Sequence, residues 1–179
     1  MGSIWRSRRK IDEKKQSILK VEIHAIKNKI ISAISELIAD MNSSDVREKY
    51  VIVCKNKHQP DFMHIAEQLN ASYININLEL SRRLLDIPKK KIPFKANRYL
   101  EDIINNSNKN IILLDRIEIL FDPLISIDPL YFIESNSKPV TRIVNWPGEF
   151  SSKILSYAKP VHPEYKSYPN ISGRVISIK

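Results

Sequence analysis

Glycine, cysteine and long apolar runs are scarce in this chain of 179 residues. Its three glycines, Gly2, Gly148 and Gly173, lie far apart, so no glycine-rich loop is available to cradle a phosphate group. The single cysteine, Cys54, cannot form an internal disulfide, which favours a reducing, cytoplasmic location. No apolar run approaches the roughly 20 residues that span a bilayer, so we expect no membrane partner.

Positive charge is abundant and unevenly distributed along the chain, which carries a net charge of +9. Residues 1–29 hold nine basic and three acidic residues, and residues 82–98 hold seven basic ones. Such clusters are typical of contact with nucleic acid or an acidic protein, and equally of a solvated surface that keeps a protein soluble. The residues that would contact DNA are Arg6, Arg8, Arg9, Lys10, Lys14, Lys15, Lys89, Lys90 and Lys91.

Hydrophobic periodicity divides the chain near residue 42. Over residues 17–41 the apolar residues recur every three or four positions, which predicts an amphipathic helix. Its apolar stripe either packs on the domain that follows or binds a partner helix, and we favour the first. These apolar residues are Ile23, Ile26, Ile30, Ile34, Leu37 and Met41. We therefore predict a basic N-terminal arm and helix over residues 1–42 and an α/β domain over residues 43–179.

Beyond residue 43, short β-branched runs alternate with helical patterns. Strands are expected at residues 50–54, 72–76, 110–114, 140–146 and 174–178, and helices at 61–69, 78–87 and 97–106. Strands separated by helices predict a parallel sheet that is covered on both faces. Near the C-terminus, Tyr157, His162, Tyr165 and Tyr168 predict an aromatic loop punctuated by prolines, which either covers the edge of the sheet or docks a partner.

The junction between the first strand and the following helix is where such sheets bind nucleotide phosphates. A working phosphate loop reads G-x-x-x-x-G-K-[ST], but the matching residues 55–62 of this chain read KNKHQPDF. Pro60 replaces the second glycine, Asp61 the lysine and Phe62 the hydroxyl that binds Mg²⁺. Any remaining contact with an anion would have to come from Lys55, Lys57 or His58.

The strand at residues 110–114 is followed by Asp115, which is how a Walker B strand presents the carboxylate that binds the metal. Glu118, three residues further on, could orient a water molecule in an active ATPase. An acid at the end of a buried strand also commonly caps the next turn, so both interpretations remain open.

Several segments resemble the BrxF family of small P-loop-containing proteins from type III bacteriophage-exclusion (BREX) systems. They are residues 74–85, LLDRIEILFDP at 113–123, DPL at 128–130, WPG at 146–148 and LSYAKPVHPEY at 155–165. Relatives tend to have a glycine-rich loop at residues 55–62, and glycine is expected where Val161 stands. In related ATPases, the position of Asn145 often holds a polar sensor of the γ-phosphate.

The resemblance implies a P-loop NTPase-like parallel sheet of about five strands flanked by helices, preceded here by the N-terminal amphipathic helix. It also implies antiphage defence alongside larger ATPase and DNA-modifying subunits. The main hypothesis is therefore a non-catalytic accessory subunit that needs no cofactor. It would bind other defence-system subunits, and its further candidate partners are double-stranded DNA and a second copy of the chain.

Two alternatives remain open. One is an ATPase with an atypical loop, in which Asp115 holds Mg²⁺, Glu118 polarises water, and Lys55, Lys57, His58 and Asn145 contact ATP. The other is a plain DNA-binding adaptor, whose affinity should fall steeply with salt because phosphate contacts release counterions.

Overall fold

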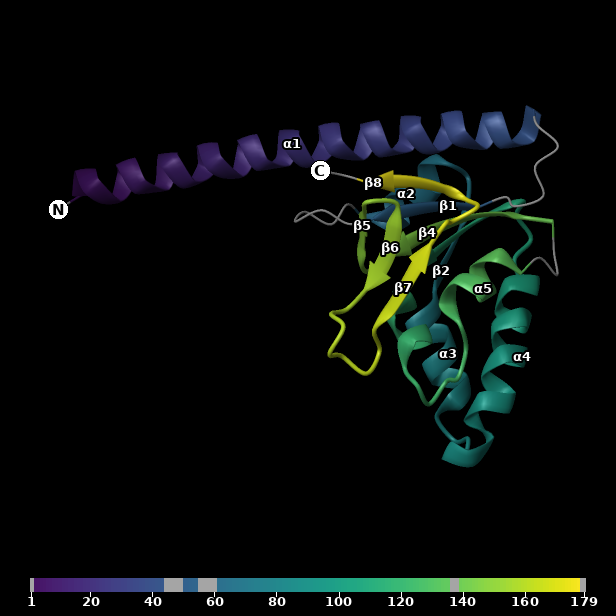
Figure 1. Ribbon diagram of the computed structural model, residues 1–179. Helices are drawn as coiled ribbons and strands as arrows, with labels where there is room; N and C mark the ends of the chain where they lie inside the picture. Colours follow the sequence, from purple (N-terminus) through teal and green to yellow (C-terminus); the bar gives the residue numbers. More distant parts are fainter. Residues whose placement is uncertain (1, 44–49, 55–60, 136–138, 178–179) are drawn as a thin grey trace.

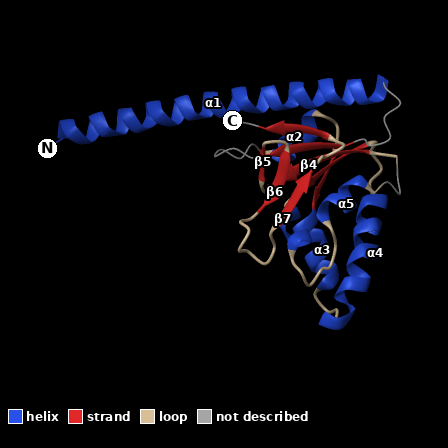
Figure 2. Cartoon of the chain, in the orientation of Figure 1, coloured by secondary structure: helices blue, strands red, loops and turns tan. Residues whose placement is uncertain are grey.

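The computed structural model describes residues 2–43, 50–54, 61–135 and 139–177. Within them, a five-stranded parallel sheet in the order β2-β3-β4-β1-β8 forms the centre of the molecule (Figures 1 and 2). Its strands are β1 (Tyr50–Cys54), β2 (Ser72–Asn75), β3 (Ile111–Asp115), β4 (Thr141–Trp146) and β8 (Arg174–Ser177). The predicted α/β class and parallel sheet are confirmed.

Helices cover both faces of this sheet, as the predicted parallel pairing requires. They are α1 (Gly2–Ser43), α2 (Phe62–Gln68), α3 (Ile76–Leu84), α4 (Ile92–Asn105) and α5 (Pro129–Glu134), with the short 3₁₀ helices η1 (Lys89–Lys91) and η2 (Ile117–Phe121). Successive side chains of a strand point to opposite faces. Val51 and Val53 therefore face α1 and α2, whereas Ile52 and Cys54 face the side of α3, α4 and α5.

Helix α1 begins at Gly2, well before the predicted start at residue 17. At 1.5 Å per residue its 42 residues measure about 63 Å. Only its second half lies against the sheet, and the first half projects beyond the domain (Figure 1). Ile30, Ile34, Ile38 and Met41 are buried against β1 and α2, so the prediction that the stripe packs on its own domain is confirmed for this half.

The C-terminal region differs from the expected aromatic loop. It forms an antiparallel sheet of β5 (Glu149–Ser151), β6 (Ile154–Tyr157) and β7 (Lys166–Pro169). Tyr157 and Tyr168 lie on these strands and pack on Phe121 and Trp146, with the Phe121 and Tyr157 rings 3.8 Å apart between centroids. The loop prediction was wrong for these two tyrosines. Strands β6 and β7 are joined by a long connection that contains prolines, and such a connection lacks the sequence signature of a short hairpin turn.

The packing of α1 generates the first prediction. Ile34 is fully buried under this helix, whereas Val21, on its projecting half, is 67% exposed. Ile34→Ala should lower the free energy of unfolding by about 2–5 kcal/mol because it leaves a cavity in the core. The matched control, Val21→Ala, should change it by less than about 0.5 kcal/mol. Urea unfolding followed by far-UV circular dichroism measures both, and equal effects would show that α1 does not pack as described.

Candidate functional site

The strand order defines one place where a ligand is expected. After β1 the chain continues into α2 on one face of the sheet, and after β4, the neighbour of β1, it continues into β5 and β6 on the other face. In open α/β sheets, ligands bind outside the carboxyl ends of two such strands. The first part of the predicted phosphate loop, with Lys55, Lys57 and His58, lies outside the described residues.

The end of that loop has a structural role in α2. Asp61 is the N-cap residue of α2, and its side chain accepts a hydrogen bond from the backbone N–H of His64 at 3.2 Å. Phe62 is 4% exposed and belongs to the core cluster that contains Val51 and Val53. The positions that match the lysine and the Mg²⁺ hydroxyl of a phosphate loop are therefore a helix cap and a core side chain.

Three polar side chains meet at the carboxyl ends of neighbouring strands. Asp115 of β3 accepts a hydrogen bond from the Tyr73 hydroxyl at 2.6 Å through Oδ2 and from Asn145 Nδ2 at 2.5 Å through Oδ1. Asp115 is 6% exposed and Asn145 4% exposed. Because side chains alternate along strands, the three residues, which we call the carboxylate triad, share the face of the sheet on which α2 packs.

The surroundings of Tyr73 favour the protonated form of its hydroxyl. Burial raises the pKa of Tyr73 above its ordinary value, and the hydrogen bond to the Asp115 carboxylate raises it further. The charge of Asp61 at the start of α2 contributes in the same direction. Tyr73 is therefore a hydrogen-bond donor to Asp115 at neutral pH, and the triad joins β2, β3 and β4.

Asp115 also caps the turn that follows β3. Its Oδ1 accepts a hydrogen bond from the backbone N–H of Arg116 at 2.8 Å. Arg116 has a left-handed backbone conformation with φ of 52°, which is uncommon for a residue other than glycine. Its carbonyl accepts a hydrogen bond from the backbone N–H of Asn77 at 3.0 Å. Of the two interpretations of Asp115, the geometry supports the capping acid directly.

The protein itself supplies the hydrogen-bond donors to the Asp115 carboxylate. Oδ1 accepts two hydrogen bonds and Oδ2 accepts one, so three of the roughly four acceptor sites of the carboxylate are used. Within the described ranges, no group of three His, Cys, Asp or Glu residues could hold a metal ion. Glu118 lies in η2, where its charge raises the pKa of the Tyr157 hydroxyl, after the larger effects of burial and of Glu164.

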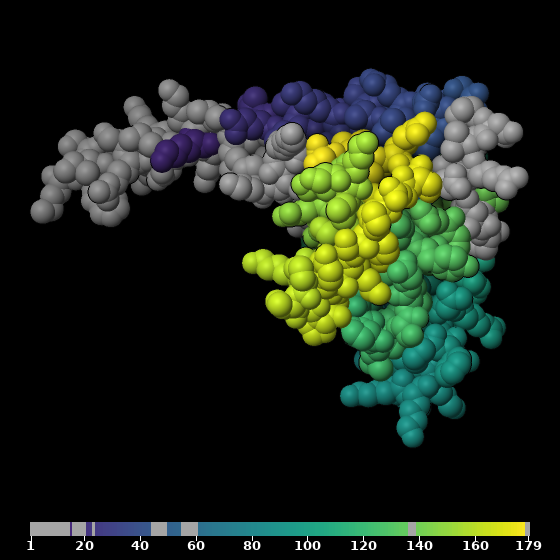
Figure 3. Space-filling view, in the orientation of Figure 1, coloured from purple at the N-terminus to yellow at the C-terminus, as the bar shows by residue number. Residues whose placement is uncertain are grey.

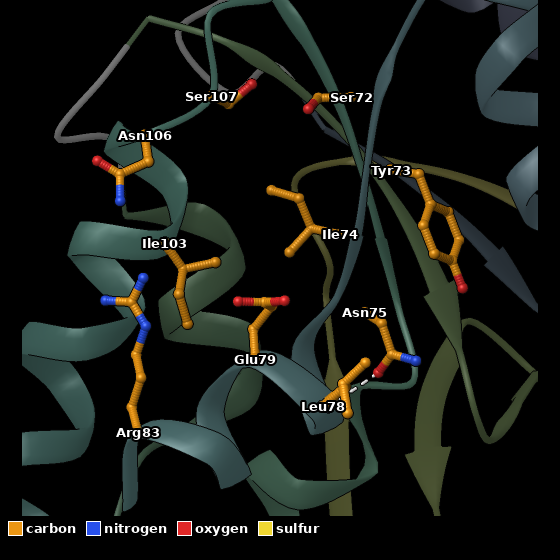
Figure 4. A pocket seen from close by; sticks show the side chains of 10 residues that line it. All are labelled: Ser72, Tyr73, Ile74, Asn75, Leu78, Glu79, Arg83, Ile103, Asn106 and Ser107. Carbon is orange, nitrogen blue, oxygen red and sulfur yellow. Dashed lines mark hydrogen bonds between the residues drawn. The ribbon is translucent and has the colours of Figure 1, made fainter.

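A cavity of about 380 Å³ lies elsewhere, beside the free edge of β2 (Figure 4). Glu79 and Arg83 of α3 and Asn106 and Ser107 after α4 contribute its polar groups. The Tyr73 side chain points away from this cavity in Figure 4. None of the side chains predicted from the sequence to form a site lines it.

The structure separates the two predicted groups of DNA-binding residues. Lys15 is exposed on α1. The structure places the backbone of α1 at Arg6, Arg8, Arg9, Lys10 and Lys14 but does not describe their side chains. Lys89, Lys90 and Lys91 are exposed on η1, between α3 and α4. Helices α1 and α4 cover opposite faces of the sheet, so Lys15 and the lysines of η1 belong to elements on opposite sides of it.

No protein-family model, curated protein or solved structure matches this chain. Among the described residues, no helix is long and apolar enough to cross a membrane.

Tyr73 was not predicted as a site residue. It precedes Asp115 by 42 positions, and only the pairing of β2 with β3 brings their side chains together. Asn145 and Asp115 were both predicted, and the structure does bring them together. A tyrosine in a short strand carries no sequence signal that it bonds to a distant acid.

The triad generates the second prediction. Asp115→Asn should lower the free energy of unfolding by about 1–3 kcal/mol because it removes the charge that strengthens the bonds from Tyr73 and Asn145. Combined with Tyr73→Phe in a double-mutant cycle, it should show a coupling energy of about 0.5–3 kcal/mol. Urea unfolding with and without millimolar Mg²⁺ measures both values. Stabilisation by Mg²⁺ that is lost in Asp115→Asn would instead identify Asp115 as a metal ligand.

Proposed function

We propose that this chain is a non-catalytic accessory subunit, derived from a P-loop NTPase, of a bacterial antiphage defence complex of the BREX type. The observation that carries the proposal is the start of α2, where Asp61 caps the helix and Phe62 is buried in the core. A carboxylate beside the first turn of this helix repels a polyphosphate, and a buried phenyl ring offers Mg²⁺ no ligand.

P-loop ancestry is supported by the rest of the sheet. Strand β4 lies between β1, which leads into the degenerate loop, and β3, which ends in Asp115. The acid and the polar Asn145 on the neighbouring strand correspond to the Walker B carboxylate and the sensor of an active relative. In this chain the same pair takes part in the carboxylate triad, so an ancestral catalytic position serves the stability of the fold.

The proposed activity is binding to other subunits, including a larger ATPase, and to DNA. The projecting half of α1 extends beyond the domain and is available for a partner (Figure 1). The connection between β6 and β7 also presents apolar side chains to solvent, because Val161 is 95% and Tyr165 36% exposed. Exposed apolar and aromatic groups of this kind serve as anchors in protein interfaces. This connection belongs to one of the segments that resemble the BrxF family.

A second candidate function is an ATPase with an atypical loop. The observation that favours it is Asn145 Oδ1, which is buried without a hydrogen-bond partner among the described groups. A buried acceptor without a partner costs about 1–3 kcal/mol, so such atoms often have a functional reason. Under this alternative the lysine contact to phosphate would come from Lys55 or Lys57.

A nucleotide titration separates the two candidates and is the third prediction. A fluorescent ATP analogue should show no saturable binding at millimolar concentration, with or without Mg²⁺, because the start of α2 lacks both the lysine and the hydroxyl. Asp115→Asn is the matched variant. Saturable, Mg²⁺-dependent binding by the wild type that this variant loses would contradict the proposal and favour the ATPase.

The fourth prediction is that the defence system requires this protein. In cells that carry the complete defence system, deletion of this chain should abolish protection in a phage plating assay. Asp115→Asn should retain protection at temperatures where the variant is folded, because no catalytic step depends on the carboxylate. Protection that survives deletion of the chain would contradict a role as a required subunit.

A further inference from the structure

The free end of the hairpin formed by α3 and α4 carries two large apolar side chains that are mostly exposed to water. Leu85, which follows α3, and Phe94, in the first turn of α4, are each 83% exposed. Their neighbours Leu84, Ile92 and Ala96 fill the core instead. We call this end the lysine tip, and its residues are Leu85, Lys89, Lys90, Lys91, Phe94 and Lys95.

The lysine tip is the outer end of the hairpin, on the side of the sheet opposite α1 (Figure 3). In that view, individual side chains stand out from the teal end of the molecule, so the surface is convex. Full burial of an exposed Leu or Phe side chain is worth about 1.5–3 kcal/mol. Because this end is convex, the two side chains can be buried by inserting them into a partner, and their burial would favour binding.

The charge around these side chains is mainly positive. Residues 82–98 contain seven basic residues and one acidic residue, Asp86. Arg82 forms an ion pair with Glu79 at 4.0 Å, whereas Lys89, Lys90 and Lys91 form none within the described part of the chain. A densely negative partner such as a nucleic acid therefore complements the charge of this end.

The backbone of η1 determines how the three lysines are spread. A 3₁₀ helix has three residues per turn, so Lys89, Lys90 and Lys91 leave the axis in directions about 120° apart. A flat acidic surface could contact only some of them, whereas a groove with phosphates along both walls can contact all three. Lysine is also depleted in protein–protein interfaces, which argues against a protein as the main partner.

We propose that the lysine tip binds double-stranded DNA, with the lysines on phosphates along the two sides of a groove and with Phe94 and Leu85 inserted at a base step. Proteins that bend DNA insert apolar wedges in this way and pair them with basic contacts to the backbone. Arg98 lies one helical turn after Phe94, on the same face of α4, and adds a phosphate contact. This inference deepens the DNA contact of the proposed function and does not depend on nucleotide binding.

The experiment uses the full chain and a short DNA duplex that contains 2-aminopurine, whose fluorescence rises when a base step is unstacked. Wild-type protein should bind with a strong salt dependence and raise this fluorescence. The triple variant Lys89→Gln, Lys90→Gln, Lys91→Gln should make the slope of log K against log salt shallower by about 2.7, since each phosphate contact contributes about 0.9. Phe94→Ala should lose the fluorescence increase while the slope stays the same.

Two matched controls use residues elsewhere on the surface. Tyr131→Ala removes an aromatic side chain on α5 that is 72% exposed, and it should retain the fluorescence increase. The triple variant Lys27→Gln, Lys29→Gln, Lys153→Gln removes the same charge from other parts of the surface and should retain it as well. Circular dichroism verifies that each variant is folded.

Three results would overturn the inference. The first is that the duplex does not bind at low salt. The second is that the Phe94→Ala variant still raises the fluorescence. The third is that the protein binds vesicles of anionic phospholipid through Phe94 but does not bind duplex DNA. The nucleotide titration does not involve the lysine tip, so a failure here is distinguishable from a failure of the proposed function.

Discussion

A parallel sheet must have both of its faces buried, and the rest of this structure depends on how that requirement is met. On one face, α3, α4 and α5 supply enough apolar surface. On the other face, the only helix that follows a strand among the described residues is α2, which has seven residues. Helix α1 completes the cover of that face with Ile30, Ile34, Ile38 and Met41. An N-terminal helix that resembles an appendage in the sequence is therefore part of the core.

The same face of the sheet also explains the carboxylate triad. Asp115 lies at the carboxyl end of β3, where a carboxylate would be costly to bury without partners. Tyr73 and Asn145, on the strands to either side, supply two hydrogen bonds, and the N–H of Arg116 supplies a third. Fully bonded, the acid joins three strands and directs the turn into η2. The buried carboxylate thus contributes to the stability of the fold.

The surfaces remote from this site offer three separate contacts. The projecting half of α1, the connection between β6 and β7, and the lysine tip lie on different elements, and the first and last lie on opposite sides of the sheet. The proposed role as an accessory subunit would use such separate surfaces to join components of a larger assembly.

By itself, the sequence determined the local elements and the degenerate loop. Short apolar, β-branched runs located all five parallel strands, and helical patterns located most helices. Pro60, Asp61 and Phe62 already differed from a phosphate loop. The expected loop at Tyr157 and Tyr168 was wrong because pairing among β5, β6 and β7 has no local signal. Strand order is likewise a non-local property. Only the tertiary structure could join Tyr73 to Asp115 across 42 residues, make Asp61 a helix cap and place the two basic segments on opposite sides, because these outcomes depend on which strands pair and which faces are buried.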